Sequence, residues 1–164
     1  MISYIWRAKP KAAALVEMAI VLMVLLTMTF GIIEFGMMMR AYLTIAEVAR
    51  DGVRSAALGN PTGVVDSRIV NTTSALGLSS MDLTSVYQEY RTYAKATGVW
   101  SSWTTLGNTP DGTQNNAPND ATYESQVRIR LVYSYHLITG RLFAAIFGPS
   151  GLVSLNTSGV MKRE

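Results

Sequence analysis

The most extended pattern in the chain is an apolar run near its N-terminus. No charged residue occurs from Met18 to Ile33, and the run reaches back to Ala13 with Glu17 as its one charged member. A helix of roughly 20 residues crosses the ~30 Å core of a bilayer, whereas the apolar core of a cleaved signal peptide has about 7 to 15 residues. The pattern therefore predicts a retained transmembrane helix over residues 13–39.

Beyond Arg40 the pattern becomes amphipathic, with apolar residues at spacings of three and four and charged residues on another face. The apolar set is Leu43, Ile45, Ala46, Val48, Ala49, Val53, Ala56 and Ala57, and the charged set is Glu47, Arg50, Asp51 and Arg54. We expect the helix to continue over residues 40–58. It should end at Leu58, because Gly59 is a good C-terminal cap residue and Pro61 cannot continue a helix.

Residues 59–164 mix helical and strand patterns and suffice for one small domain. Val64 to Leu78 has the spacing of a short helix, and Met81 to Tyr93 favours a strand because it is rich in β-branched and aromatic residues. Gly, Asn and Pro cluster from Gly107 to Pro118 and predict an exposed loop. Leu137 to Phe147 fits a short helix or a buried turn, and Leu152 to Met161 fits a final strand.

The clearest strand pattern runs from Tyr123 to Tyr135, where side chains alternate between two faces. One face holds Tyr123, Ser125, Val127, Ile129, Leu131, Tyr133 and Tyr135, and the other holds Glu124, Gln126, Arg128 and Arg130. We therefore expect an α+β fold. In it, the amphipathic half of a long N-terminal helix packs against a small, mainly antiparallel sheet, and the other half of the helix is transmembrane.

The net charge of +3 comes from the N-terminus alone. Arg7, Lys9 and Lys11 account for it, because the other 11 Lys and Arg residues balance 11 Asp and Glu residues. By the positive-inside rule, these three cations place residues 1–12 in the cytoplasm as a basic leader and residues 59–164 outside it. The balanced remainder offers no basic patch for nucleic acid.

The side-chain chemistry argues against catalysis. His136 is the only histidine, cysteine is absent and no Gly-rich phosphate loop occurs, so we expect no enzyme activity and no cofactor. Asp111, Asp120 and Glu124 lie in or beside the predicted loop, but their spacing matches no calcium-binding loop, and we expect no metal site.

A group of aromatic residues has two explanations. Its members are Tyr87, Tyr90, Tyr93, Trp100 and Trp103. They favour packing in the core or in a hairpin, which is the commoner use of such residues, and the second explanation is a sticky or glycan-binding surface.

Two carboxylates interrupt or border the apolar run. A carboxylate costs about 2 to 3 kcal/mol at the centre of a transmembrane helix and less near its ends. Glu17 therefore either reaches the headgroups from a shallow position or pairs with a partner. Glu34 lies near the outer boundary, where we expect an interfacial acid that faces water.

Three segments together carry a family resemblance. They are Lys11-Ala12-Ala13-Ala14-Leu15-Val16-Glu17-Met18, Gly31-Ile32-Ile33-Glu34-Phe35-Gly36, and Ala46-Glu47-Val48-Ala49-Arg50-Asp51-Gly52-Val53-Arg54. In this order, after a basic leader, they resemble TadE-like pseudopilins of the tight-adherence (Flp) pilus system. The ending from Gly159 to Glu164 resembles that family too, whereas the resemblance is weak over residues 60–123. Ala12 stands where the family typically has glycine, and Met18 where it has an aromatic residue.

The resemblance implies a pilin-like fold and a minor subunit of a type IV-like pilus, inserted in the bacterial inner membrane and possible in an extracellular filament. It implies cleavage by a prepilin peptidase between Ala12 and Ala13, which makes Glu17 the fifth residue of the mature chain. The new α-amino group of one subunit would pair with Glu17 of its neighbour. Implied partners are other pilin or pseudopilin subunits, the peptidase, the assembly platform and the lipid bilayer.

A second function remains open from the sequence. In this alternative the helix is a simple anchor for a periplasmic binding module that uses the aromatic residues.

Overall fold

The computed structural model describes residues 10–108, 117–138 and 151–163. The chain divides into two units, residues 1–37 and 38–164, which are described separately below. Most of the predicted loop at 107–118 and of the predicted helix or turn at 137–147 lies outside the described residues. So do Arg7, Lys9, Asp111 and the side chain of Lys11.

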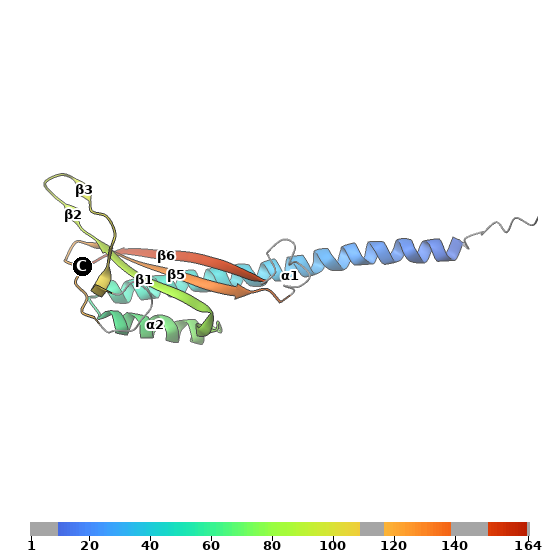
Figure 1. Cartoon of the computed structure of the whole chain (residues 1–164), viewed down its shortest axis with the longest axis horizontal. Coiled ribbons are helices and arrows are strands. Elements are labelled where there is room, and N and C mark those ends of the chain that lie inside the picture. The colour runs from blue at the N-terminus through green and yellow to red at the C-terminus, as the bar shows by residue number, and fades with distance from the viewer. Residues whose placement is uncertain (1–9, 109–116, 139–150, 164) are drawn as a thin grey trace, which may run out of the picture. The chain divides into compact units, whose positions relative to one another are not determined.

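The long N-terminal helix is present. Helix α1 runs from Pro10 to Ala57, which confirms the prediction for residues 13–58 (Figure 1). It ends as expected, because Gly59 has φ +86° and its N–H donates to the carbonyl of Ala56 at 3.0 Å. This left-handed conformation suits glycine and closes the helix.

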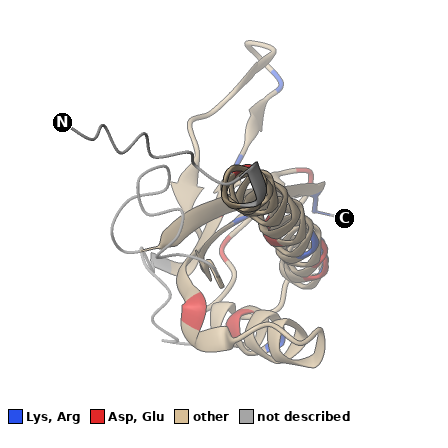
Figure 2. Ribbon diagram, turned by 90° about the vertical axis from the view of Figure 1, so that its right-hand side faces the viewer, with Lys and Arg blue, Asp and Glu red and all other residues tan. Residues whose placement is uncertain are grey.

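A four-stranded antiparallel sheet forms one layer of the second unit, and the C-terminal part of α1 packs against it. Its order is β4-β1-β5-β6, with β1 at Leu83–Arg91, β4 at Thr104–Thr105, β5 at Gln126–His136 and β6 at Leu152–Lys162. A separate hairpin pairs β2 (Tyr93–Ala94) with β3 (Val99–Trp100). This hairpin projects beyond the end of the sheet in both views (Figures 1 and 2). The predicted α+β fold with a small antiparallel sheet is confirmed.

Alternation along β5 builds the core. Val127, Ile129 and Leu131 are fully buried and belong to one cluster with Ile45 and Val48 of α1. Burying an aliphatic side chain of this size stabilises a fold by roughly 1.5 to 3 kcal/mol. The inward face of the strand is therefore the one that its sequence predicted, and it packs on the amphipathic part of α1.

The start of this strand differs from the prediction. Tyr123 is 78% exposed, and β5 begins only at Gln126. Glu124 has φ +66°, which turns the backbone out of the extended conformation before the strand begins. The prediction that Tyr123 lies on the buried face is therefore wrong.

Helix α2, from Thr62 to Ala75, is joined to its neighbours by polar pairs. Arg68 binds Asp51 of α1 through two hydrogen bonds of 2.7 and 2.9 Å, and this arginine lowers the pKa of Asp51. On the other side, Gln88 of β1 donates to the buried carboxylate of Asp66 at 2.6 Å. Desolvation raises the pKa of Asp66 above its ordinary 3.8, although the hydrogen bond from Gln88 opposes this shift.

The C-terminal end of α1 is held by residues far along the chain. The side-chain amide of Asn119 donates to the Ala56 carbonyl at 2.7 Å and to the Asn60 carbonyl at 3.2 Å. Arg163 in turn donates to Asn119 at 3.0 Å and to the carbonyl of Ala121. Because a helix leaves its last carbonyls without internal partners, these contacts stabilise the end of α1 and favour a cation beside it.

Gly159 brings β6 against α1, and we predict that Gly159→Ala destabilises the fold. An added Cβ would lie 2.9 Å from the backbone oxygen of Ala49 and 3.1 Å from a methyl of Val53. Forced repacking of this kind costs about 1 to 3 kcal/mol. Thermal unfolding of the full chain in detergent, followed by circular dichroism, measures the loss. Ser158→Ala, at the exposed neighbouring position, is the control, and an equal effect of both substitutions would contradict the prediction.

Asp66→Asn should stabilise the fold at neutral pH, by roughly 1 kcal/mol, because it removes a buried charge and keeps a group that can bond to Gln88. The folded-state pKa of Asp66 lies above the unfolded value. Protonated Asp66 therefore contributes to the stability of the fold. This contribution is fully present below the unfolded pKa and is lost as the pH rises through the folded pKa. The gain in stability should accordingly shrink as the pH falls toward about 4.

Asp51→Asn is the control, because its effect on stability should depend on pH in the opposite direction. The pKa of Asp51 is lowered, so its contribution is present above the unfolded pKa and is lost at acid pH. Denaturant unfolding of both variants at several pH values makes the comparison. A loss of stability in Asp66→Asn at neutral pH would show that the carboxylate form is the favoured one.

Candidate functional site

The first part of α1 presents apolar side chains in all directions. Leu15, Met18 and Ile32 are each 72% exposed, and the large apolar residues between them are exposed as well. In the described part of the chain, one helix is long and apolar enough to cross a membrane, and none of its most apolar 18 residues is buried. A helix that is apolar all round requires an apolar environment, either a protein core or a bilayer.

Polar groups within this segment are satisfied by the helix itself. Thr27 and Thr29 donate their hydroxyls to the carbonyls four residues earlier, Met23 and Leu25, both at 2.8 Å. Local bonds of this kind suit a bilayer, where no water is available to bond with a hydroxyl.

Glu17 is an exposed exception in this segment. It lies four residues after Ala13, so both residues face the same side of α1, about one turn apart. Ala12 and Ala13 are exposed too, and both lie within the helix, which begins at Pro10. The structure thus places the predicted cleavage bond and the predicted pairing carboxylate close together on accessible surface.

Glu34 lies in the same unit as Glu17, directly after the uncharged run from Met18 to Ile33. The expectation that it is an interfacial acid which faces water stays a prediction.

Arginines accompany two of the aromatic residues on the outer face of the sheet. The Trp103 ring has the guanidinium of Arg91 4.6 Å and that of Arg128 4.1 Å from its centroid. Arg128 also bonds to Glu89 on the paired strand at 2.7 Å. Arg130 lies 4.2 Å from the Tyr87 centroid in the same way. These are cation–π contacts, worth about 0.5 to 1 kcal/mol each at exposed sites.

The predicted aromatic group is therefore divided among three places. Tyr90 packs against the core, and Tyr93 and Trp100 face each other in the β2–β3 hairpin, as the commoner explanation predicted. Tyr87 and Trp103 instead lie on the outer face with arginines. The alternation of residues 123–135 had already predicted that Arg128 and Arg130 lie on this face, but no local pattern predicted the position of Trp103, which follows the hairpin.

The remaining polar candidates make structural contacts. His136 Nε2 lies 3.2 Å from Asp82 Oδ1 and its side chain is largely exposed. Asp120 accepts the backbone N–H of Gly107 at 3.1 Å, and Glu124 pairs with Lys95 at 2.6 Å. Among the described residues, no three His, Cys, Asp or Glu side chains gather to hold a metal ion.

Comparison with known protein families gives a match near the N-terminus. The model of the family described as TadE-like protein matches residues 12–54, a segment that contains Ala12, Ala13, Glu17 and Glu34. No curated protein and no solved structure matches the chain. The matched segment is the apolar part of α1 with most of its amphipathic part. Over residues 12–54 the resemblance to TadE-like proteins is thus confirmed.

Proposed function

We propose that this protein is a minor pilin-like subunit, a pseudopilin, that acts in assembly of a tight-adherence type IV-like pilus. The observation that carries the proposal is the exposed apolar segment of α1 at residues 13–33, which lies within the TadE-like match and bears one carboxylate, Glu17. Its role is structural and non-catalytic. The helix packs with helices of other pilin or pseudopilin subunits, first in the membrane and then in the filament.

The energetics of Glu17 support this role. A carboxylate in apolar surroundings is costly, and an opposite charge in a low-dielectric environment compensates the cost. Cleavage between Ala12 and Ala13 creates an α-amino group that is largely protonated at neutral pH. In a bundle of subunits, this group of one helix pairs with Glu17 of the next, and the pair sets the axial register between the two helices.

The proposed membrane topology follows from the basic residues that precede the apolar segment. Arg7, Lys9 and Lys11 retain the N-terminus in the cytoplasm, the peptidase removes it at the inner membrane, and the α+β unit lies in the periplasm. From there, the assembly platform transfers the subunit toward the filament.

The first prediction concerns processing. Protein purified from its native membrane should begin at Ala13, because the peptidase removes the basic leader. Intact mass with N-terminal peptide mapping decides this, and Ala12→Gly should increase the processed fraction because glycine is typical before the cut. A chain that still begins at Met1 in cells with an active prepilin peptidase would favour a plain membrane anchor.

The second prediction concerns assembly. Glu17→Gln should reduce the number of pili by about tenfold or more, because the loss of a buried ion pair costs more than 1.4 kcal/mol. Membrane insertion should be unimpaired, since glutamine carries no charge into the bilayer. Pili are counted by electron microscopy in cells that contain the other pilus components, and insertion is measured by membrane fractionation.

Glu47→Gln is the matched control, because Glu47 is an exposed glutamate on the same helix. It should leave the number of pili unchanged. Normal piliation of the Glu17→Gln strain would refute the pairing role and favour the alternative, a periplasmic binding module anchored by α1.

A further inference from the structure

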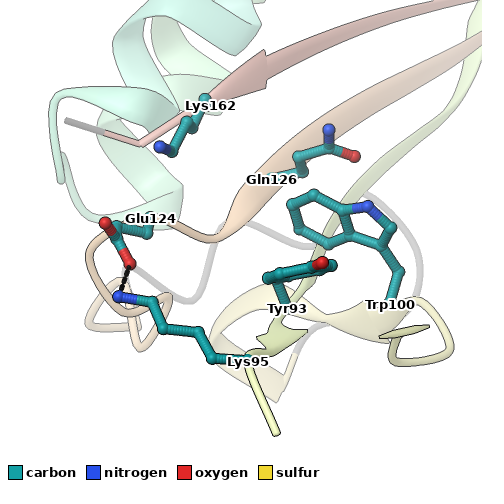
Figure 3. A pocket seen from close by; sticks show the side chains of 6 residues that line it. All are labelled: Tyr93, Lys95, Trp100, Glu124, Gln126 and Lys162. Carbon is teal, nitrogen blue, oxygen red and sulfur yellow. Dashed lines mark ion pairs between the residues drawn. The ribbon is translucent and has the colours of Figure 1, made fainter. Parts of the chain in front are cut away.

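An open cleft of about 490 Å³ lies between the β2–β3 hairpin and the end of the main sheet. Its lining residues are Tyr93, Lys95, Trp100, Glu124, Gln126 and Lys162 (Figure 3). They come from the hairpin, from the turn before β5 and from the adjacent ends of β5 and β6. A cleft of this volume falls within the usual range for small-ligand sites, about 300 to 1,000 Å³.

One side of the cleft is aromatic. Tyr93 and Trp100 are paired across the hairpin, with ring centroids 5.1 Å apart and planes at 52°. The guanidinium of Arg91 lies 4.9 Å from the Trp100 centroid and helps to hold this ring in place. Tyr93 nevertheless remains 44% exposed. The hairpin thus presents a supported aromatic surface to a ligand.

The other side is polar and charged. Lys95 of the hairpin reaches Glu124 at 2.6 Å, and this contact joins the hairpin to the turn before β5. Glu124 keeps a φ of +66°, a backbone conformation that is unfavourable for residues other than glycine. First Lys95 and then Lys162 lower the pKa of Glu124. The carboxylate is therefore ionised and held at the edge of the cleft.

Lys162 gives the cleft a net positive charge. Its side chain is exposed, and no salt bridge to it occurs within the described part of the chain. Two lysines against one glutamate leave one cation uncompensated. Gln126 adds an amide whose Oε1 accepts a hydrogen bond from Arg91 Nε at 2.9 Å, so its N–H groups remain for a ligand.

We propose that this cleft binds an acidic saccharide. The apolar face of a sugar ring packs on Tyr93 and Trp100, its hydroxyls bond to Gln126 and Glu124, and its carboxylate is bound by Lys162. A mixture of aromatic surface, hydroxyl-bonding groups and one spare cation matches a carboxylated sugar better than an apolar peptide side chain, which would require an enclosed apolar pocket.

The inference is independent of pilus assembly, because it concerns a surface on the α+β unit and is tested on purified protein. Full-length protein in detergent micelles is titrated with tetragalacturonate and with neutral maltotetraose, up to about 1 mM ligand. Tryptophan fluorescence and calorimetry follow binding. The acidic ligand should bind at least about fivefold more tightly than the neutral one at low salt.

Two variants test the charged side and the aromatic side of the cleft separately. Lys162→Gln should weaken tetragalacturonate binding about two- to fivefold, the range for exposed ion pairs, and should leave any maltotetraose binding unchanged. Tyr93→Leu should weaken binding of both sugars about three- to tenfold. Arg50→Gln, at an exposed cation on α1, is the control and should change neither affinity. Circular dichroism verifies that each variant is folded.

Four results would overturn the proposal. They are no binding of the acidic ligand, equal binding of both sugars, equal weakening by Lys162→Gln and Arg50→Gln, and tighter binding of tetra-aspartate than of tetragalacturonate. The third result would indicate nonspecific charge attraction, and the fourth would indicate an acidic peptide ligand.

Discussion

The α+β unit depends on close packing of α1 against the sheet. Ala49, Val53 and Ala56 are almost fully buried, and they leave room for the strands to approach the helix backbone. Gly159 completes the fit, since a Cβ at this position would meet the Ala49 carbonyl at 2.9 Å. Gly52 serves the same purpose toward α2, because its Cβ would lie 2.8 Å from Ile69. Small residues on both surfaces thus allow one thin, well-packed core.

The same helix satisfies a different constraint in the first unit. There the described residues present apolar side chains on all sides, whereas residues 38–57 bury one face against their own domain. One helix therefore joins a segment with an exposed apolar surface to a segment that is stabilised by its own sheet. The TadE-like match spans this change of environment and ends at Arg54, near the end of the helix.

Polar contacts determine where the C-terminal half of the chain attaches. Asn119 and Arg163 are separated by 44 positions, yet both lie at the end of α1 and bond to each other. At the end of the chain, Gly159 permits the approach of β6, and Arg163 holds the loop that caps the helix. On the outer face, arginines cover tryptophan and tyrosine rings that would otherwise leave exposed apolar surface.

The sequence by itself determined the elements whose side chains repeat with a clear period. These are the apolar and amphipathic parts of α1, the alternating face of β5, and the stop at Gly59, because each depends on local geometry and on contact with water or lipid. Tertiary structure alone decided the turn at Glu124 that exposes Tyr123 and the arginine contacts of Trp103. It also created the cleft between the hairpin and the sheet. These features depend on which distant segments meet, and no local period encodes such meetings.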